Sequence, residues 1–315
     1  MSKLAFVFPG QGSQHLGMLA QLAENESIII DTFKEASEVL GYDLWDLVQN
    51  GPEESLGKTE ITQPALLTAS YAMWQLWKEK GGVLPELMAG HSLGEYSALV
   101  CAGSLKFQDA VKLVEMRGQF MQAAVPQGEG SMAAIIGLDD ALVIEACAEA
   151  AAAEQQVVEA VNFNSPGQVV IAGNKVAVER AMVLVKEKGA KRALPLAVSA
   201  PSHCALMKPA AAKLALELTR IEIQAPNIPV IQNVTAATEL NPDQIRQNLI
   251  EQLYRPVLWT DSIKYLVAKD ITRTVECGPG KVLSGLNKRI QKGLIAGAIN
   301  DMSNLDAELT LGENE

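Results

Sequence analysis

The sequence predicts an α/β protein in which a large domain with a parallel sheet is interrupted by a small second domain. Short, continuous apolar runs that end in loops, such as "KLAFVF" before "PGQGSQ", are typical of buried parallel strands. From about Gly130 the pattern changes to a self-contained alternation of strands and helices. The length of 315 residues is enough for two domains, or for one large domain with an insertion.

The large domain begins with a strand in "KLAFVF", followed by a loop from Pro9 to Gln14. A second strand is predicted in "LPELMAG", directly before Gly90-His91-Ser92-Leu93-Gly94, and a helix follows and ends at Gly103. A G-x-S-x-G segment between a strand and a helix is the pattern of a nucleophile elbow. We therefore expect the large domain to be α/β-hydrolase-like.

The small domain is predicted from six consecutive elements. Strands are expected in "SMAAIIGL", "VVEAVNF", "QVVIAG" and "KRALPLAV", and helices in "DDALVIEACAEAAAAE" and "KVAVERAMVLVKEKG". This β-α-β-β-α-β order is that of a ferredoxin-like unit. Strand and helix patterns of the large domain resume after Ala200, so we place the large domain at 1–127 and 199–315 and the small one at 128–198.

Composition narrows the functional classes. The chain has 26 Lys and Arg against 37 Asp and Glu, a net charge of -11, which argues against nucleic acid as the main partner. No apolar run is long enough for a membrane helix or suited to a signal peptide, so we expect no membrane partner and a cytoplasmic protein. Four scattered cysteines indicate neither disulfides nor a zinc site. The acidic end, "DMSNLDAELTLGENE", is expected to be a solvated, frayed tail.

Ser92 is the candidate nucleophile. Flanking glycines let the chain turn sharply, which exposes the hydroxyl and leaves the amide of Leu93 free at a helix N-terminus to donate to an oxyanion. The loop after the first strand is placed to supply a second donor, the amide of Gln11. The alternatives are a serine in a bend of small residues and a loop whose glycines only form turns.

A serine hydroxyl needs a base to take its proton, and the chain has three histidines. His203, in "VSAPSHCALM", follows a predicted strand at the start of a helix, a placement that can bring it to the same rim as Ser92. His91 adjoins the serine and is expected to point elsewhere as a structural hydrogen-bonding residue. His15 is expected to be a loop residue. His203 is therefore the candidate base.

Arg117 is the sharpest anomaly in the sequence. In "FQDAVKLVEMRGQFMQAAV" it falls in the middle of an apolar helical stripe. A guanidinium on such a face is costly unless it is paired or reaches water. It either pairs with an internal acid or binds a substrate carboxylate through two hydrogen bonds.

Several motifs together resemble one known family. "FVFPGQGSQ", "GHSLGEYSALVCAG", "EMRGQFMQ", "SAPSHCALM" and "NLIEQLYRPVLW" look like the malonyl-CoA:acyl carrier protein transacylases of fatty acid synthesis and the acyltransferase domains of polyketide synthases. The resemblance extends from Phe6 to about Gly280. Ser202 stands where many malonyl-selecting polyketide synthase domains carry Phe, and in this it resembles the stand-alone bacterial enzymes.

The resemblance implies transfer of malonyl from malonyl-CoA to the phosphopantetheine thiol of acyl carrier protein. We expect no metal or redox cofactor and a monomeric enzyme. The resemblance also implies a backbone carbonyl near Gln252, in place of an acid, as the group that orients His203. The implied site comprises the nucleophile Ser92, the base His203, the oxyanion-binding amides of Gln11 and Leu93, the carboxylate-binding Arg117, and Gln252.

Acyl carrier proteins are acidic, so the resemblance also implies a local basic surface beside the site. "KEKGAKR", Lys186 to Arg192, is the densest basic segment and a candidate for it. The alternative is a solvated helix end, whose bases suit its C-terminus.

Two rival functions use the same residues differently. A serine esterase or thioesterase would pass the acyl group to water and would need an acid before the histidine, for which Asp109 and Asp139 are the candidates. Asp139 is better explained as an acid in the first turn of a helix than as a catalytic acid. Asp109 is better explained as part of a solvent-facing helix start. A non-catalytic protein that binds acyl carrier protein would leave Ser92 and His203 without a role.

Overall fold

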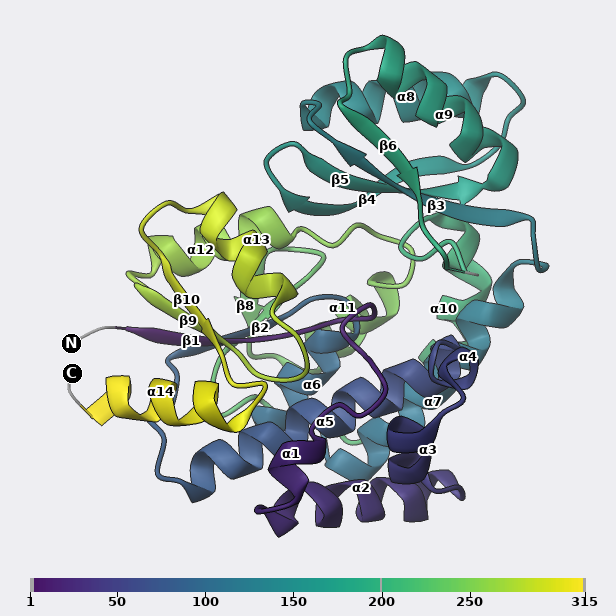
Figure 1. Cartoon of the computed structure of the whole chain (residues 1–315). Helices are drawn as coiled ribbons and strands as arrows, with labels where there is room; N and C mark the ends of the chain where they lie inside the picture. Colours follow the sequence, from purple (N-terminus) through teal and green to yellow (C-terminus); the bar gives the residue numbers. More distant parts are fainter. Residues whose placement is uncertain (1–2, 199, 314–315) are drawn as a thin grey trace.

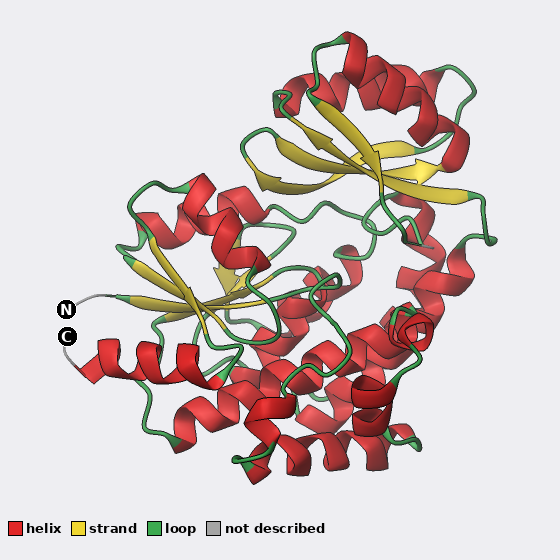
Figure 2. Ribbon diagram, viewed as in Figure 1, coloured by secondary structure: helices red, strands yellow, loops and turns green. Residues whose placement is uncertain are grey.

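The computed structural model describes residues 3–198 and 200–313 and has a mixed α/β fold with two separate sheets (Figures 1 and 2). The larger sheet has six strands in the order β10-β9-β1-β2-β7-β8. All its neighbouring pairs are parallel except β7 with β8. Its strands are β1 (Leu4–Phe8), β2 (Leu87–Gly90), β7 (Val230–Gln232), β8 (Ala237–Glu239), β9 (Arg273–Glu276) and β10 (Ile295–Ala298). The prediction of a parallel-rich sheet is confirmed.

Strand β1 shows why the strands of this sheet appear in the sequence as continuous apolar runs. Phe6 and Phe8 belong to the core on one face, and Ala5 and Val7 to the core on the other. Successive strand residues point to opposite faces, so a strand covered on both sides needs apolar residues throughout.

The helices of this unit are α1 (Ala20–Ala23), α2 (Ser27–Leu40), α3 (Leu44–Asn50), α4 (Glu53–Leu56), α5 (Thr59–Glu79), α6 (Leu93–Cys101), α7 (Phe107–Ala124), η1 (Ala205–Met207), α10 (Lys208–Leu218), α11 (Pro242–Glu251), α12 (Trp259–Ala268), α13 (Val282–Ile290) and α14 (Met302–Glu313).

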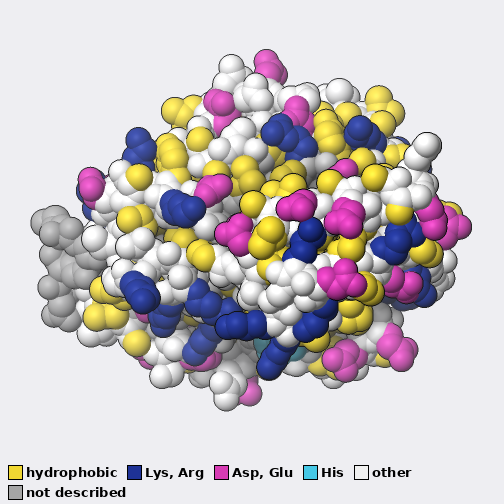
Figure 3. Space-filling model, turned by 90° about the horizontal axis from the view of Figure 1, so that it is seen from above, with side chains coloured by type: hydrophobic (Ala, Val, Ile, Leu, Met, Phe, Trp, Pro, Cys, Tyr) yellow, Lys and Arg dark blue, Asp and Glu magenta, His cyan; other side chains and the backbone are white. Residues whose placement is uncertain are grey.

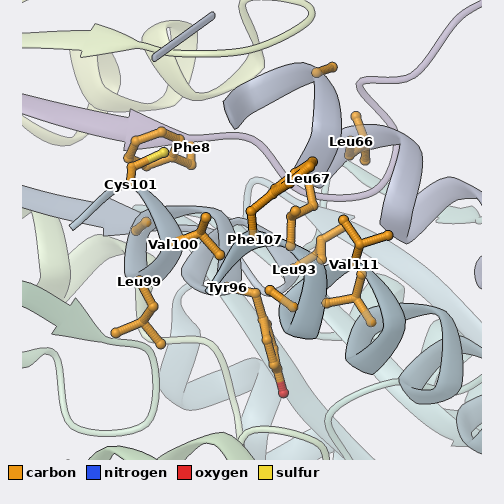
Figure 4. Close-up of a cluster of buried hydrophobic side chains, with 14 of the residues drawn as sticks. Phe8, Leu66, Leu67, Leu93, Tyr96, Leu99, Val100, Cys101, Phe107 and Val111 are labelled. Atoms are coloured by element: carbon orange, nitrogen blue, oxygen red, sulfur yellow. The ribbon is translucent and has the colours of Figure 1, made fainter. Parts of the chain in front are cut away.

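Helix α6 is buried along its whole length. All nine of its residues are buried, and it packs between the sheet and helices α5 and α7. Figure 4 shows its apolar side chains, including Leu93, Leu99 and Val100, among those of neighbouring elements such as Phe8 and Phe107. Closely packed neighbours resist displacement, so Leu93, the first residue of this helix, is held firmly in place.

The smaller sheet is antiparallel and has the order β4-β5-β3-β6. Its helices lie on its outer face, and its other face is turned toward the rest of the molecule (Figure 1). The elements are β3 (Gly130–Ile136), α8 (Asp140–Ala152), β4 (Val158–Ser165), β5 (Gln168–Asn174), α9 (Lys175–Glu187) and β6 (Arg192–Pro195). A separate small unit was predicted and is confirmed. The exact domain limits stay predictions, and residues 1–2, 199 and 314–315 lie outside the described residues.

The two units are joined along β4. The amide of Phe163 donates to the carbonyl of Val257 over 3.0 Å, and the amide of Val257 donates to that of Val161 over 2.8 Å. The Thr260 hydroxyl donates to the Phe163 carbonyl over 2.9 Å. These bonds place the small sheet beside the segment between α11 and α12.

The expectation of a frayed tail is wrong for residues 301–313, the part of the acidic segment that the structure describes. Residues Met302–Glu313 form α14, Leu305 is fully buried, and Glu308 forms an ion pair with Arg273 of β9. The apolar residues of this acidic segment are spaced to give the helix a buried side, which the charge count conceals. Within residues 3–198 and 200–313 no helix combines the length and the apolar character needed to span a membrane.

Candidate active site

Ser92 lies on a sharp turn between β2 and α6. Its backbone has φ 52° and ψ -109°, a positive φ that is strained for a residue with a side chain. The two flanking positions have no room for a side chain, and therefore require glycine. A Cβ on Gly90 would lie 1.9 Å from the carbonyl of Gly94, and one on Gly94 would lie 2.1 Å from the carbonyl oxygen of Phe8. The G-x-S-x-G pattern is therefore the sequence of a turn that is held against β1.

Asn233, which follows β7, fastens this turn from the neighbouring strand. Its Oδ1 accepts from the amide of Ser92 over 2.8 Å, and its Nδ2 donates to the carbonyl of Gly90 over 2.6 Å. Its own amide donates to Glu95 Oε2 over 2.9 Å. These bonds satisfy buried backbone groups that the strained turn would otherwise leave unpaired.

His203 is hydrogen-bonded to the serine hydroxyl. Its Nε2 lies 2.8 Å from Ser92 Oγ, and its Nδ1 lies 2.6 Å from the carbonyl oxygen of Gln252. A carbonyl only accepts, so Nδ1 carries the hydrogen and the neutral Nε2 accepts from the hydroxyl. Burial, with a smaller contribution from the charge of Arg117, lowers the pKa of His203 to about 3. The imidazole is therefore neutral at ordinary pH, with Nε2 as the acceptor that faces the serine hydroxyl.

Arg117 reaches the same hydroxyl from α7. Its guanidinium is buried, and Nη2 donates to Ser92 Oγ over 3.3 Å and to Gln252 Oε1 over 2.9 Å. Nη1 donates to Gln63 Oε1 over 2.7 Å, and the group lies 5.3 Å from the centre of the Tyr96 ring. All these acceptors are neutral. Burial lowers the pKa of the arginine, which is the cost expected for a buried cation without a bonded carboxylate.

Gln252, at the end of α11, connects these groups. Its Nε2 donates to the Ser92 carbonyl over 3.0 Å, to Glu95 Oε2 over 2.9 Å and to Asn233 Oδ1 over 3.3 Å. Its side-chain oxygen accepts from Arg117 and its backbone carbonyl from His203. One fully buried residue thus contacts Ser92, His203 and Arg117.

The two predicted oxyanion donors lie in two segments, the start of α6 and the loop after β1. Leu93 is the first residue of α6, so its amide is one of the helix N–H groups without an intrahelical acceptor. Gln11 lies in the loop after β1, next to Gly10, where a Cβ would lie 2.5 Å from the carbonyl oxygen of His91. The loop therefore packs directly against the turn.

Comparison with known proteins decides the family. The sequence model of the acyl transferase domain matches residues 5–292. The chain belongs to the acyl transferase family. The malonyl CoA-acyl carrier protein transacylase of Escherichia coli K12 is 62% identical over 311 residues, which cover 99% of this chain and 100% of the relative. The protein of the same name from Bacillus subtilis is 48% identical over 306 residues, 97% of this chain and 96% of the relative.

Solved structures of family members agree closely with this fold. An acyl carrier protein S-malonyltransferase from Vibrio cholerae is 61% identical, with a TM-score of 0.95 over 97% of this chain and 99% of that one. A malonyl-transacylase in complex with a type II PKS acyl carrier protein is 58% identical, with a TM-score of 0.97 over the full length of both chains.

The remaining polar candidates in this acyl transferase lie away from the serine hydroxyl. His91 Nε2 is 2.7 Å from Asn164 Oδ1, and His15 Nδ1 is 3.4 Å from the Ser13 carbonyl in its loop. Asp139 caps α8, accepting from the amide of Ala141, and Asp109 lies in the first turn of α7. In the described residues no three His, Cys, Asp or Glu side chains are grouped to hold a metal ion.

Sequence reasoning missed two buried residues of this site, Glu95 and Asn233. Glu95 carried a signal, because it is an acid in the otherwise uncharged helix "LGEYSALVC". It is fully buried, and burial raises its pKa to about 7. Asn233 carried no such signal, since an asparagine after a strand is ordinary.

Proposed function

We propose that this acyl transferase moves a malonyl group from malonyl-CoA to the phosphopantetheine thiol of acyl carrier protein, through a malonyl ester of Ser92. One observation carries the proposal. The Ser92 hydroxyl is within hydrogen-bond distance of both a neutral imidazole nitrogen and a buried guanidinium. A nucleophile, its base and a cation suited to a carboxylate therefore meet at one atom, which fits an acyl group that ends in a carboxylate.

In the first half-reaction His203 Nε2 takes the proton of Ser92 as Oγ attacks the thioester carbon. The amides of Gln11 and Leu93 stabilise the negative charge on the former carbonyl oxygen. The intermediate then collapses, the carbon–sulfur bond breaks, and the CoA thiolate takes the proton from His203. The malonyl ester of Ser92 remains, with its carboxylate held by Arg117.

The second half-reaction reverses these steps with another thiol. The phosphopantetheine thiol of acyl carrier protein gives its proton to His203 and attacks the ester, and Ser92 leaves and regains its proton. Gln252 holds His203 through its backbone carbonyl, in the place where a hydrolase triad would use an acid. The reaction balances with these two substrates, so the proposal includes no metal or redox cofactor.

The carrier as partner is supported by the relative that was solved with a type II PKS acyl carrier protein. An acidic carrier needs a basic surface, and Figure 3 shows Lys and Arg side chains gathered along the lower edge of the face seen from above. A monomeric state, a cytoplasmic location and the lack of a nucleic-acid or membrane partner stay predictions.

We also propose the finer fold assignments. A parallel sheet with a nucleophile turn after β2 supports an α/β-hydrolase-like large domain, 1–127 and 199–315. The element order and the strand order β4-β5-β3-β6 support a ferredoxin-like small domain, 128–198.

The test is a chase of the acyl-enzyme. The protein is incubated with radiolabelled malonyl-CoA, separated from free CoA ester, and mixed with either holo acyl carrier protein or buffer. We expect the label to pass to the carrier much faster than it is lost to buffer. Apo carrier, which has no phosphopantetheine thiol, is the matched control. Rapid release to buffer with no label on the carrier would identify a thioesterase instead.

A further inference from the structure

Glu95 is a buried carboxylate that the proposed reaction does not use. It lies on α6, one turn after Ser92, and is fully buried. Its Oε2 accepts from the amide of Asn233 and from Gln252 Nε2, each over 2.9 Å. We propose that Glu95 is a positioning residue, which fixes the side-chain amide of Gln252 so that its oxygen faces Arg117. The role of Arg117 in malonyl binding rests on the proposed function.

The amide of Gln252 has two chemically different ends. Its nitrogen end faces three acceptors, which are the Ser92 carbonyl, Glu95 Oε2 and Asn233 Oδ1. Its oxygen end faces the guanidinium of Arg117, which only donates. If the amide turned over, an oxygen would face three acceptors and an NH2 group would face a guanidinium. The neighbours of Gln252 therefore permit one orientation.

Glu95 is the strongest of the three acceptors. Above the Glu95 pKa of about 7 its carboxylate oxygen makes a charge-assisted bond, whereas the other two acceptors are neutral. Asn233 Oδ1 already accepts from the Ser92 amide over 2.8 Å and is 3.3 Å from Gln252. The Ser92 carbonyl also accepts from the Glu95 amide over 3.1 Å. Without the carboxylate, the nitrogen end of Gln252 keeps only acceptors that are shared.

The orientation of Gln252 matters because of the guanidinium nitrogen that it holds. Arg117 Nη2 contacts both Gln252 Oε1 and the nucleophilic hydroxyl. The other nitrogen is held by Gln63, whose own NH2 group donates to the sulfur of Met121 over 3.6 Å, a weak acceptor. Glu95 thus acts, through Gln252, on the nitrogen that lies beside Ser92.

The kinetic test compares three variants of α6. Glu95→Met is close in volume and removes the carboxylate, Glu95→Gln keeps an oxygen acceptor, and Ser97→Ala is the control. Ser97 is buried on the same helix, and its hydroxyl has no hydrogen-bond partner among the described residues. Acylation of Ser92 is measured with malonyl-CoA and with acetyl-CoA, which lacks the carboxylate.

We expect Glu95→Met to lower the ratio of malonyl to acetyl acylation rates by about 10- to 100-fold, because a misplaced binding group costs this much. Glu95→Gln should keep most of the ratio and Ser97→Ala all of it. Equal losses with both esters in Glu95→Met, or a glutamine variant as poor as the methionine variant, would overturn the proposal.

A crystal structure of each Glu95 variant gives a readout that does not depend on activity. In the methionine variant the Gln252 oxygen should no longer lie within hydrogen-bond distance of Arg117 Nη2, and in the glutamine variant it should. Persistence of this contact in Glu95→Met refutes the positioning role. If the unaltered protein takes no malonyl label, the proposed function fails, and the crystal structures still decide the role of Glu95. Should Glu95→Met not fold, Glu95→Gln alone decides: a lost contact or a lowered ratio contradicts the proposal.

Discussion

The two units of the molecule bury different kinds of side chain. The core of the small unit, between its sheet and helices α8 and α9, consists of aliphatic residues and one cysteine. Its charged groups lie outside, as in the ion pairs of Lys188 with Glu145 and of Arg180 with Glu154. The large unit has similar layers, but beneath the Ser92 turn it buries a cation, an acid and an imidazole: Arg117, Glu95 and His203.

This difference distinguishes the buried side chains that folding requires from those that a reaction at Ser92 would require. An aliphatic core is sufficient to stabilise a sheet and two helices, and buried polar groups cost free energy unless they are bonded to one another. In the large unit one set of such groups forms a network with Ser92 and Gln252, and Arg273 and Glu308 form a separate buried ion pair. Substitutions in the two units should therefore change different properties, which the following predictions test in order of decreasing effect.

Ser92→Ala removes the proposed nucleophile and should have the largest effect. We expect no covalent malonyl label and a loss of transfer of about 10³-fold or more, as for other serine nucleophiles. Alanine and serine meet the same strain at φ 52°, so the fold should be kept. Mass spectrometry of the acyl-enzyme measures the label, and label that survives in this variant would place the nucleophile elsewhere.

Arg117→Ala should reduce malonyl acylation by about 100-fold, which is roughly 2.7 kcal/mol of transition-state stabilisation, because the carboxylate loses its charged partner. Acetyl acylation, which needs no cation, should fall far less. The matched control is Arg180→Ala, which removes an arginine from the small unit and should leave both rates unchanged. Equal loss with both esters would show that Arg117 is only structural.

Ile171→Ala tests folding stability, the property that we expect the aliphatic core of the small unit to determine. Ile171 is fully buried in β5 within the aliphatic core, and its truncation should lower the free energy of unfolding by about 2–4 kcal/mol. Urea denaturation measures this change. The acylation rate per folded molecule should stay within about twofold, since no polar contact of the site is altered. A large loss of rate in the folded variant would show that the two units are coupled.

The pH dependence should show a base that stays neutral in acid. The pKa of His203 is lowered to about 3, so the proton is bound, and base function lost, only as the pH falls through that value. We therefore expect kcat/KM for malonyl-CoA, which reports the free enzyme, to stay level from about pH 8 to about pH 5 as far as His203 is concerned. An acid limb with a midpoint near the ordinary histidine pKa, about 6.5, that persists in Glu95→Gln would contradict this, because that variant lacks the buried acid whose pKa is about 7.

How much the sequence predicts also differs between the two units. In the small unit all six elements were predicted, because its strands and helices follow regular apolar patterns between clear turns. In the large unit the pattern gave β1, β2, the serine turn, the helix after it and, beyond Ala200, the elements α10, β7, α11 and β9, but not the helices α2 to α5 or α14. Those helices cover the sheet in an arrangement that the local pattern does not specify.

The site residues were predictable when they broke a local rule. Arg117 stood out on an apolar stripe, Ser92 had its glycines, and His203 was one of three histidines. Gln252 came only from family resemblance, because a glutamine near a helix end is unremarkable until the fold places it beside Arg117. Asn233 was missed for the same reason. Its contacts with the Ser92 turn span 141 residues of sequence, and no local pattern records them.

The smallest effect is expected for the basic segment from Lys186 to Arg192. Lys188 Nζ lies 2.9 Å from Glu145 and 3.5 Å from Glu149, and Lys186 Nζ donates to the backbone carbonyls of Ala190 and Lys191, which follow α9. These contacts are local to the small unit and are typical of a solvated helix end. Charge reversal of Lys188 and Lys191 should therefore leave the KM for acyl carrier protein within about twofold at moderate salt. A clear rise in this KM, with the KM for malonyl-CoA unchanged, would instead make the segment part of the carrier-binding surface and give the small unit a direct role in the second half-reaction.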